Sequence, residues 1–185
     1  MEVIDVFKIP IFREELSIDN QKLLSYCVSR KELDTGRKSS NCGGWQSNNL
    51  DKSAHELKDL ISAIENCAIK ATEYLSLNPP ELSNIWININ GYKDFNWAHT
   101  HPYSTISGVY YIKTPENCGD IEFERLRLES TWKYAVVNFN NYNSETWWFP
   151  SQEKVLYMFP SWLKHRVNPN LNKTEERISI SFNLG

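Results

Sequence analysis

The chain has 185 residues, of which 41% are hydrophobic and 13% aromatic, and its formal net charge is −3. This composition predicts a folded protein with a sizeable core and excludes a disordered chain. Because no run of basic residues is present to neutralise phosphates, it also argues against a nucleic-acid partner.

The sequence shows no membrane or export signal. The N-terminal stretch lacks a basic region followed by an apolar one, and no apolar run approaches the ~20 residues that span a bilayer. The four cysteines include no C-x-x-C pair, so we expect reduced thiols rather than a zinc or redox motif. A cytoplasmic protein without a membrane partner is therefore expected.

Residues 1–84 are expected to form a mainly helical support region. The first residues alternate loosely between apolar and polar types, and Pro10 limits any strand there to the edge of a sheet. Leucines at helical spacing predict a helix over residues 17–33, with Asp19 as its N-cap.

A second, longer helix is predicted over residues 53–77, after a loop rich in glycine, serine and asparagine. Its leucine, isoleucine and alanine residues recur at spacings of three and four, which is typical of an amphipathic helix. Ser53 and Glu56 have the spacing of a capping box at its start. His55 lies in the first turn, where we expect a solvated side chain.

From residue 85 onward the hydrophobic period is two, as in strands. The β-prone runs, bounded by glycine, proline or asparagine, cover residues 85–90, 105–112, 120–130, 134–140, 154–160 and 177–183. We expect seven or eight strands in succession, with these six runs among them. Helices followed by such a series predict an α+β chain whose C-terminal half is a sandwich or barrel, such as a jelly roll. We expect one domain over residues 1–185, with the strands of residues 85–185 as its core.

The run 85–90 alternates isoleucine with Trp86, Asn88 and Asn90. If the isoleucines pack toward the helices, the asparagines face the other side of the sheet. That side is either a ligand cavity or solvent, and the sequence leaves both open.

Three histidines are candidates for a metal site. His99 and His101 are two residues apart, so they point the same way if the segment is a strand. His165 follows a later β-prone run, at the start of a loop. An oxygen-activating Fe(II) ion needs ligands on one face, with the opposite positions open.

Arg177 and Ser179 follow the third histidine and share one face of the last predicted strand. A co-substrate with two carboxylates, 2-oxoglutarate, would chelate the metal at one end and need a deep cationic partner at the other. The planar fork of Arg177 meets that need, and Ser179 can add a hydroxyl donor. The alternative is that Arg177 forms a surface ion pair with Glu175 or Glu176.

Four segments together resemble one known group. “SNCGGWQS”, “HTHPYSTISGVYYIKTP”, “FPSWLKHRVNPN” and “ERISISFNLG” are similar to the 2-oxoglutarate and Fe(II)-dependent oxygenases of marine bacteria and their phages. The resemblance covers most of the chain. It implies a cupin-like double-stranded β-helix packed against the N-terminal helices, iron bound by His99 and His165, and 2-oxoglutarate held by Arg177. For a phage protein, the expected location is the host cytoplasm.

The chain departs from the wider superfamily at one metal position. There, H-x-D or H-x-E supplies a carboxylate, whereas this chain has His101. A third neutral imidazole would weaken the preference for Fe(II) over Zn(II) or Cu(II). Asp120 or Glu122 could instead supply the carboxylate, so the third ligand stays open between these residues.

Two further residues are candidates for the co-substrate pocket. Only one of Tyr110 and Tyr111 can face a cavity from a strand, and the strand arrangement of the family favours Tyr111. Asn88 is a second candidate. Packing between strands is the alternative role for both tyrosines.

The sequence thus predicts a 2-oxoglutarate-dependent, non-haem Fe(II) oxygenase that hydroxylates an unidentified small molecule or protein and releases succinate and CO₂. No catalytic residue is expected beyond the metal site. The alternatives are a cupin-like isomerase or dioxygenase that needs no 2-oxoglutarate, and a jelly-roll binding module without turnover. A homodimer is left open. The polar, aromatic segment 130–150 is the expected region of substrate selection, without Trp147 or Trp148 as site residues.

Overall fold

The structure is a computed structural model that describes residues 1–125 and 136–185. The N-terminal elements are β1 (Phe12–Glu15), α1 (Asn20–Leu33), β2 (Asn41–Cys42), β3 (Trp45–Gln46), the 3₁₀ helix η1 (His55–Leu57) and α2 (Lys58–Leu75). The strands that follow are β4 (Leu82–Asn90), β5 (Phe95–His99), β6 (Ile106–Lys113), β7 (Ile121–Glu124), β8 (Thr146–Phe149), β9 (Val155–Pro160), β10 (His165–Val167) and β11 (Arg177–Leu184).

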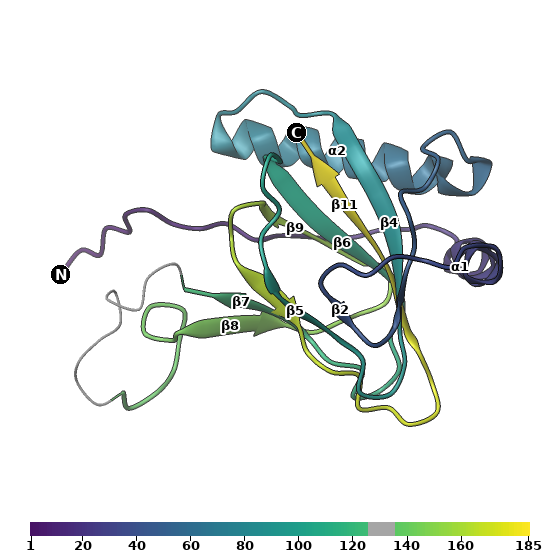
Figure 1. Cartoon of the computed structure of the whole chain (residues 1–185). Coiled ribbons are helices and arrows are strands. Elements are labelled where there is room, and N and C mark those ends of the chain that lie inside the picture. Colours follow the sequence, from purple (N-terminus) through teal and green to yellow (C-terminus); the bar gives the residue numbers. More distant parts are fainter. Residues whose placement is uncertain (126–135) are drawn as a thin grey trace.

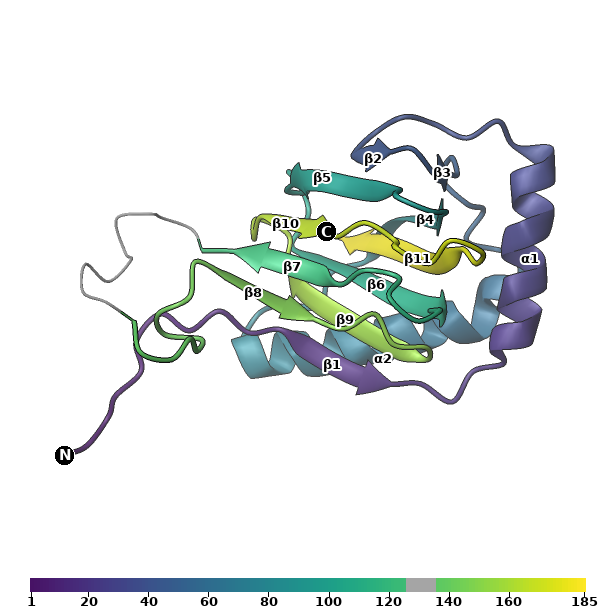
Figure 2. The ribbon, with the colours of Figure 1, turned by 90° about the horizontal axis from the view of Figure 1, so that it is seen from below.

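The strands form two antiparallel sheets. The larger has the order β1-β9-β6-β11-β4-β3, and the smaller has the order β2-β5-β10-β7-β8. Figure 1 shows α2 crossing one face of the larger sheet, and in Figure 2 the smaller sheet lies in front of the larger sheet, on the side opposite α2. The α+β architecture with two packed sheets confirms the predicted fold class.

The larger sheet is buried on both faces, by the helices on one side and by the smaller sheet on the other. Because successive side chains of a strand point to opposite faces, alternate residues face the helices and the smaller sheet. The isoleucines of β4 and β11 belong to the core that includes Leu23 of α1 and Ile64 of α2. The alternate residues of the same strands, among them Asn88 and Arg177, line a cavity between the sheets. The isoleucines of the run 85–90 thus pack toward the helices, and of the two surroundings that the sequence left open for the asparagines, the structure has the cavity.

Only one of the two predicted helix starts has the expected cap. The Asp19 carboxylate accepts hydrogen bonds from the backbone N–H groups of Gln21 and Lys22 at 3.0 and 3.2 Å, so this N-cap is confirmed. The capping box is wrong: Ser53 donates to the Asp51 carboxylate instead, and α2 begins later, after the turn η1. An aspartate two residues upstream competes for the serine hydroxyl and backbone N–H.

The N-terminal region also contributes strands. β1 lies at an edge of the larger sheet, as Pro10 predicted, and the glycine-rich loop supplies β2 to the smaller sheet and β3 to the larger one. No helix in residues 1–125 and 136–185 has the length and apolarity to cross a membrane. The division at residue 84 stays a prediction.

Two predicted strands fall partly in residues 126–135, which lie outside the described residues. β7 covers the start of the run 120–130. Residues 136–140 are not a strand, so the described part of that prediction is wrong. Asparagine side chains there bond to nearby backbone N–H groups, as Asn140 does with Tyr142, and this favours turns over a sheet.

Candidate metal centre and co-substrate pocket

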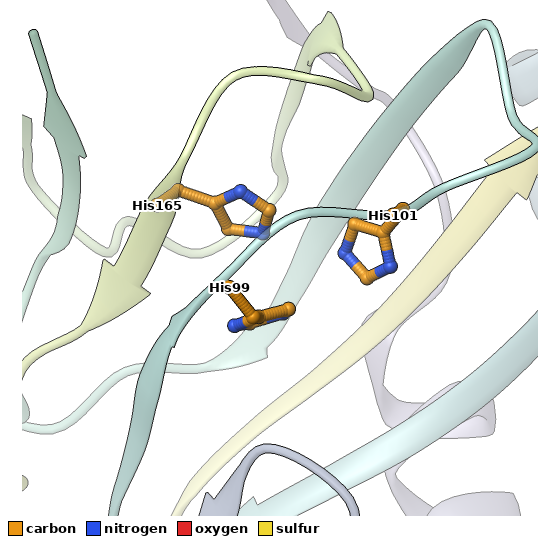
Figure 3. Close-up of side chains that lie close together, drawn as sticks. All are labelled: His99, His101 and His165. Atoms are coloured by element: carbon orange, nitrogen blue, oxygen red, sulfur yellow. The ribbon is translucent and has the colours of Figure 1, made fainter. Parts of the chain in front are cut away.

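Three imidazoles gather between the two sheets. His99 at the end of β5 is the register partner of His165 on β10, and His101 follows β5 by two residues. The potential ligand nitrogens of the three side chains all lie within 4.8 Å of one another. Figure 3 shows the three rings grouped in one place, with His99 and His165 on neighbouring strands. The arrangement can hold one metal ion.

Backbone carbonyls orient two of the three rings. Nδ1 of His99 lies 2.6 Å from the carbonyl oxygen of Trp97, and Nδ1 of His165 lies 2.9 Å from that of Leu163. A carbonyl only accepts, so each Nδ1 carries the proton and donates it. Nε2 therefore keeps its lone pair, which is the form that binds a metal.

The three imidazoles are neutral near pH 7. Burial, together with the neighbouring imidazoles, lowers the pKa of His165 to about 3 and that of His101 to about 4. Burial also lowers the pKa of His99, partly offset by its bond to Trp97. Because a metal displaces the proton, a site that already excludes the proton is prepared for the ion.

The acidic alternatives for the third ligand do not join this group. In β7, Phe123 is the register partner of His165 and faces the space between the sheets, so Glu122 points the other way. The Glu122 carboxylate instead accepts hydrogen bonds from Arg166 at 2.6 Å and Asn168 at 3.2 Å. Within the described part of the chain, no carboxylate, Asp120 included, belongs to the metal-capable group.

Arg177 is a buried cation, and one of its guanidinium nitrogens has no hydrogen-bond partner among the described residues. Its side chain is 1% exposed, and Nη1 donates to the carbonyls of Cys118 and Asn168. Nη2 is buried without a hydrogen-bond partner. Burial lowers the pKa of Arg177, but a guanidinium stays protonated in proteins. A buried charge with a free donor fits an anion at this position.

The alternative of a surface ion pair for Arg177 is wrong. Glu175 pairs with Lys113 at 3.0 Å, and Glu176 pairs with Lys31 at 2.8 Å. Both acids lie in the loop before β11, where they meet lysines at the surface. Arg177 is the first residue of the strand and, by alternation, turns inward.

Tyr111 offers a second donor in the same cavity. Its hydroxyl is buried and no group in the described part of the chain lies in hydrogen-bonding geometry to it; the nearby Ser151 hydroxyl, close enough to lower its pKa, donates to Gly119. Burial raises the pKa of Tyr111 to about 12, against the opposite effect of Ser151 and the Arg177 guanidinium, so the phenol keeps its proton. An anion beside Arg177 could accept from it.

Ser179 connects the remaining candidates. It is the register partner of both Tyr111 on β6 and Asn88 on β4, so the three side chains form a row across adjacent strands. The Asn88 amide donates to Ser181 at 3.0 Å. Tyr110 faces the helical layer, where its hydroxyl donates to Asn20 at 2.6 Å. Tyr111 is therefore the tyrosine that faces the cavity, and its contact with 2-oxoglutarate stays a prediction.

One narrow space, which we call the inner cavity, brings the candidates together. Its lining includes the three histidines and the four proposed co-substrate residues, Asn88, Tyr111, Arg177 and Ser179. Trp86 also lines it and was missed, although its alternation with Asn88 was a usable signal. His55 is exposed and outside the group, as expected.

The region expected to select the substrate is only partly visible. Residues 126–135 lie outside the described residues, and the remainder includes β8 at the edge of the smaller sheet. Trp147 and Trp148 on this strand are 37% and 55% exposed and do not line the inner cavity. They were not expected to be site residues, and this stays a prediction.

Comparison with known proteins identifies the class. Residues 84–183, more than half of the chain, match the family described as “Putative 2OG-Fe(II) oxygenase”. The protein belongs to this family: it is a 2-oxoglutarate and Fe(II)-dependent oxygenase. No match was found among curated proteins.

Solved structures show the same fold. A prolyl-4-hydroxylase from Pseudomonas putida superposes with a TM-score of 0.67 at 14% identity, covering 95% of this chain and 92% of that one. The viral collagen prolyl hydroxylase of Paramecium Bursaria Chlorella virus-1, solved with 2-oxoglutarate, gives 0.63 at 11% identity, covering 94% of each chain. HygX from Streptomyces hygroscopicus, solved with nickel and 2-oxoglutarate, gives 0.65 at 10% identity, covering 96% of this chain and 83% of that one. The double-stranded β-helix fold is thereby confirmed.

Proposed function

We propose that this oxygenase holds Fe(II) through His99, His101 and His165, and that it hydroxylates a C–H bond of a separate substrate. We further propose that Arg177 and Tyr111 bind the far carboxylate of 2-oxoglutarate. Ser179 and Asn88 complete the polar lining around the co-substrate.

One observation carries this proposal: two buried donors without partners, Arg177 Nη2 and Tyr111 Oη, line the same cavity as three neutral imidazoles. An unsatisfied buried donor costs roughly 1–3 kcal/mol, and more when charged. One carboxylate of 2-oxoglutarate would accept hydrogen bonds from both donors. A metal ion held by the imidazoles would bind the other end of 2-oxoglutarate. A metal-binding module without 2-oxoglutarate would leave the two donors unexplained.

The chemistry that Fe(II) supplies when bound is the reaction of O₂ with 2-oxoglutarate, which yields succinate, CO₂ and one oxygen atom for the substrate. The protein contributes binding and orientation. The carbonyls of Trp97 and Leu163 hold the proton on Nδ1, so that Nε2 is the ligand atom. Val109 and Phe159 form apolar walls of the cavity and limit the entry of water.

The test is an anaerobic titration. Fe(II) with 2-oxoglutarate should give a weak visible charge-transfer band in the wild-type protein, and the band should be absent in His165→Ala and Arg177→Ala. Arg166→Ala is the matched control, because this guanidinium lies on β10 but pairs with Glu122 on the outer side. No band and no uncoupled succinate formation in the wild-type protein would overturn the proposal.

We also propose a cytoplasmic location, which the four unpaired cysteines support. Whether the protein forms a homodimer stays open, as it was from the sequence. The substrate is the subject of the next inference.

A further inference from the structure

A second hollow adjoins the metal site from the side of His99 and His101. These two residues, with Ser40 and Trp86, line both this hollow and the inner cavity. Arg177 and His165 line only the inner cavity. We call the second space the outer hollow; its volume of about 510 Å³ lies within the usual range for a small-molecule site.

Arg37 carries the only permanent charge among the described residues that line the outer hollow. It takes no part in the ion pairs found in the described residues. The other lining residues supply amides, hydroxyls, two indoles and the two imidazoles. The hollow is therefore suited to one negative charge.

The guanidinium of Arg37 is held in place rather than free in solvent. It lies over the ring of Trp86, 5.7 Å from its centroid. In the amide orientation that satisfies both side chains, the oxygen of buried Gln46 accepts from Nε at 3.2 Å and from Nη2 at 3.3 Å. Nη1 remains for a ligand, and little side-chain entropy is left to lose on binding.

Trp86 links this cation to the metal site. Its ring lies 5.7 Å from that of His101, and it is only 6% exposed. Trp97, 61% exposed, also lines the hollow. Apolar surface thus lies between the charged group and the histidines, where the carbon framework of a substrate would pack.

We propose that Arg37 binds a carboxylate of the primary substrate, a small organic acid, and that Trp86 and Trp97 contact its carbon framework. This inference rests on the proposed function, because it needs His99 and His101 as metal ligands. The two arginines then serve different carboxylates: Arg177 that of 2-oxoglutarate in the inner cavity, and Arg37 that of the substrate in the outer hollow. A small molecule is favoured over a protein because the hollow, of about 510 Å³, offers one charge and two indoles within the volume of a small-molecule site.

The test uses the full chain loaded anaerobically with Fe(II) and 2-oxoglutarate. The probes are the N-acetyl-L-amino acids of the twenty coded types and their uncharged carboxamides. Binding is followed by the change in the charge-transfer band and by calorimetry. We expect at least one acid to bind about tenfold more tightly than its carboxamide, the difference that one charge-assisted hydrogen bond supplies.

Three variants separate the role of Arg37 from general effects. Arg37→Gln should remove the preference for the acid, and Arg37→Lys should restore part of it because the charge remains but the fork is lost. Lys38→Gln removes one charge from the same loop without touching the hollow, so it should leave the preference intact. Thermal unfolding of each variant checks the fold.

The inference is overturned if no acid binds at millimolar concentration, if the carboxamides bind equally well, or if Arg37→Gln keeps the preference. Loss of the 2-oxoglutarate band in Arg37→Gln would also overturn it, by making Arg37 part of the co-substrate site. If the wild-type protein gives no band at all, the metal and co-substrate assignment fails first, so the two failures are distinguishable.

Discussion

His165 lies directly opposite His99 in the antiparallel pair of β10 and β5, and their ring centroids are 4.4 Å apart. Backbone hydrogen bonds between the strands set this spacing, so it does not depend on a bound ion. We therefore expect a substitution that removes one imidazole to leave the strand pair intact. Loss of metal binding can therefore be separated from loss of fold.

Replacing His165 tests its proposed role as a metal ligand. We expect His165→Ala to weaken Fe(II) binding by at least about 100-fold, since even residues that merely support a ligand contribute 10- to 100-fold. Anaerobic Fe(II) titration measures the change, and His55→Ala, at an exposed helix start, should bind as the wild type does. Equal affinity in His165→Ala would contradict the assignment.

Replacing His101 tests the unusual third position. His101→Ala should lose metal affinity, whereas His101→Asp should regain it and shift the preference toward Fe(II) over Zn(II), because a carboxylate offsets the charge of the ion. Competition between the two metals provides the measurement. If His101→Ala binds metal like the wild type, the three-histidine site is wrong.

Replacing Arg177 tests the co-substrate anchor. Arg177→Gln should weaken 2-oxoglutarate binding by about 10- to 100-fold, the range of a charge-assisted hydrogen bond, without changing the affinity for Fe(II) alone. Calorimetry with and without 2-oxoglutarate separates the two effects. Arg166→Gln, the partly exposed guanidinium on the outer side of β10, should change neither.

Replacing Tyr111 should change protein stability and 2-oxoglutarate affinity in opposite directions. Tyr111→Phe should stabilise the metal-free protein by about 1 kcal/mol, because it removes a buried hydroxyl without a partner, and should weaken 2-oxoglutarate binding by about tenfold. Urea unfolding and calorimetry measure the two quantities.

The matched control for Tyr111 is its neighbour. Tyr110→Phe breaks the 2.6 Å hydrogen bond to Asn20 and should destabilise the protein by about 1 kcal/mol with unchanged 2-oxoglutarate affinity. Destabilisation by both substitutions would show that Tyr111 has a partner in the protein after all.

The stability of the metal-free protein should fall at acidic pH. Burial lowers the pKa of His101 to about 4 and of His165 to about 3, from an ordinary 6.5. Between the ordinary pKa of 6.5 and the lowered pKa of each histidine, the unfolded chain binds more protons than the native protein. The free energy of unfolding therefore rises with pH in this range. It is lost as the pH falls from about 6.5 toward 4 for His101 and toward 3 for His165. We expect a loss of about 1–2 kcal/mol per histidine between pH 7 and pH 5.

Urea unfolding at a series of pH values checks this dependence. His101→Asn should remove the contribution of one histidine to the pH dependence of the unfolding free energy. His55→Asn should leave that dependence unchanged, because His55 is exposed. A profile that is the same in the wild type and in His101→Asn would rule out a neutral, buried His101.

The sequence by itself determined which side chains share a face. The alternation in residues 85–90 and 177–183 separated the isoleucines from Asn88, Arg177 and Ser179, because a strand turns successive side chains to opposite faces whatever its partner is. The histidine spacing and the motifs of the family likewise indicated an iron and 2-oxoglutarate site before any fold was known.

Only the tertiary structure decided which of these faces meet. The register of β10 with β5 and β7 brings His165 to His99 and turns Glu122 away, and the glycine-rich loop carries Arg37 to Trp86 beside His101. Strand partners, register and loop paths depend on packing between residues far apart in the chain, which a local pattern does not encode. Periodicity could therefore predict the inner lining of the site, while the outer hollow emerged only from the folded chain.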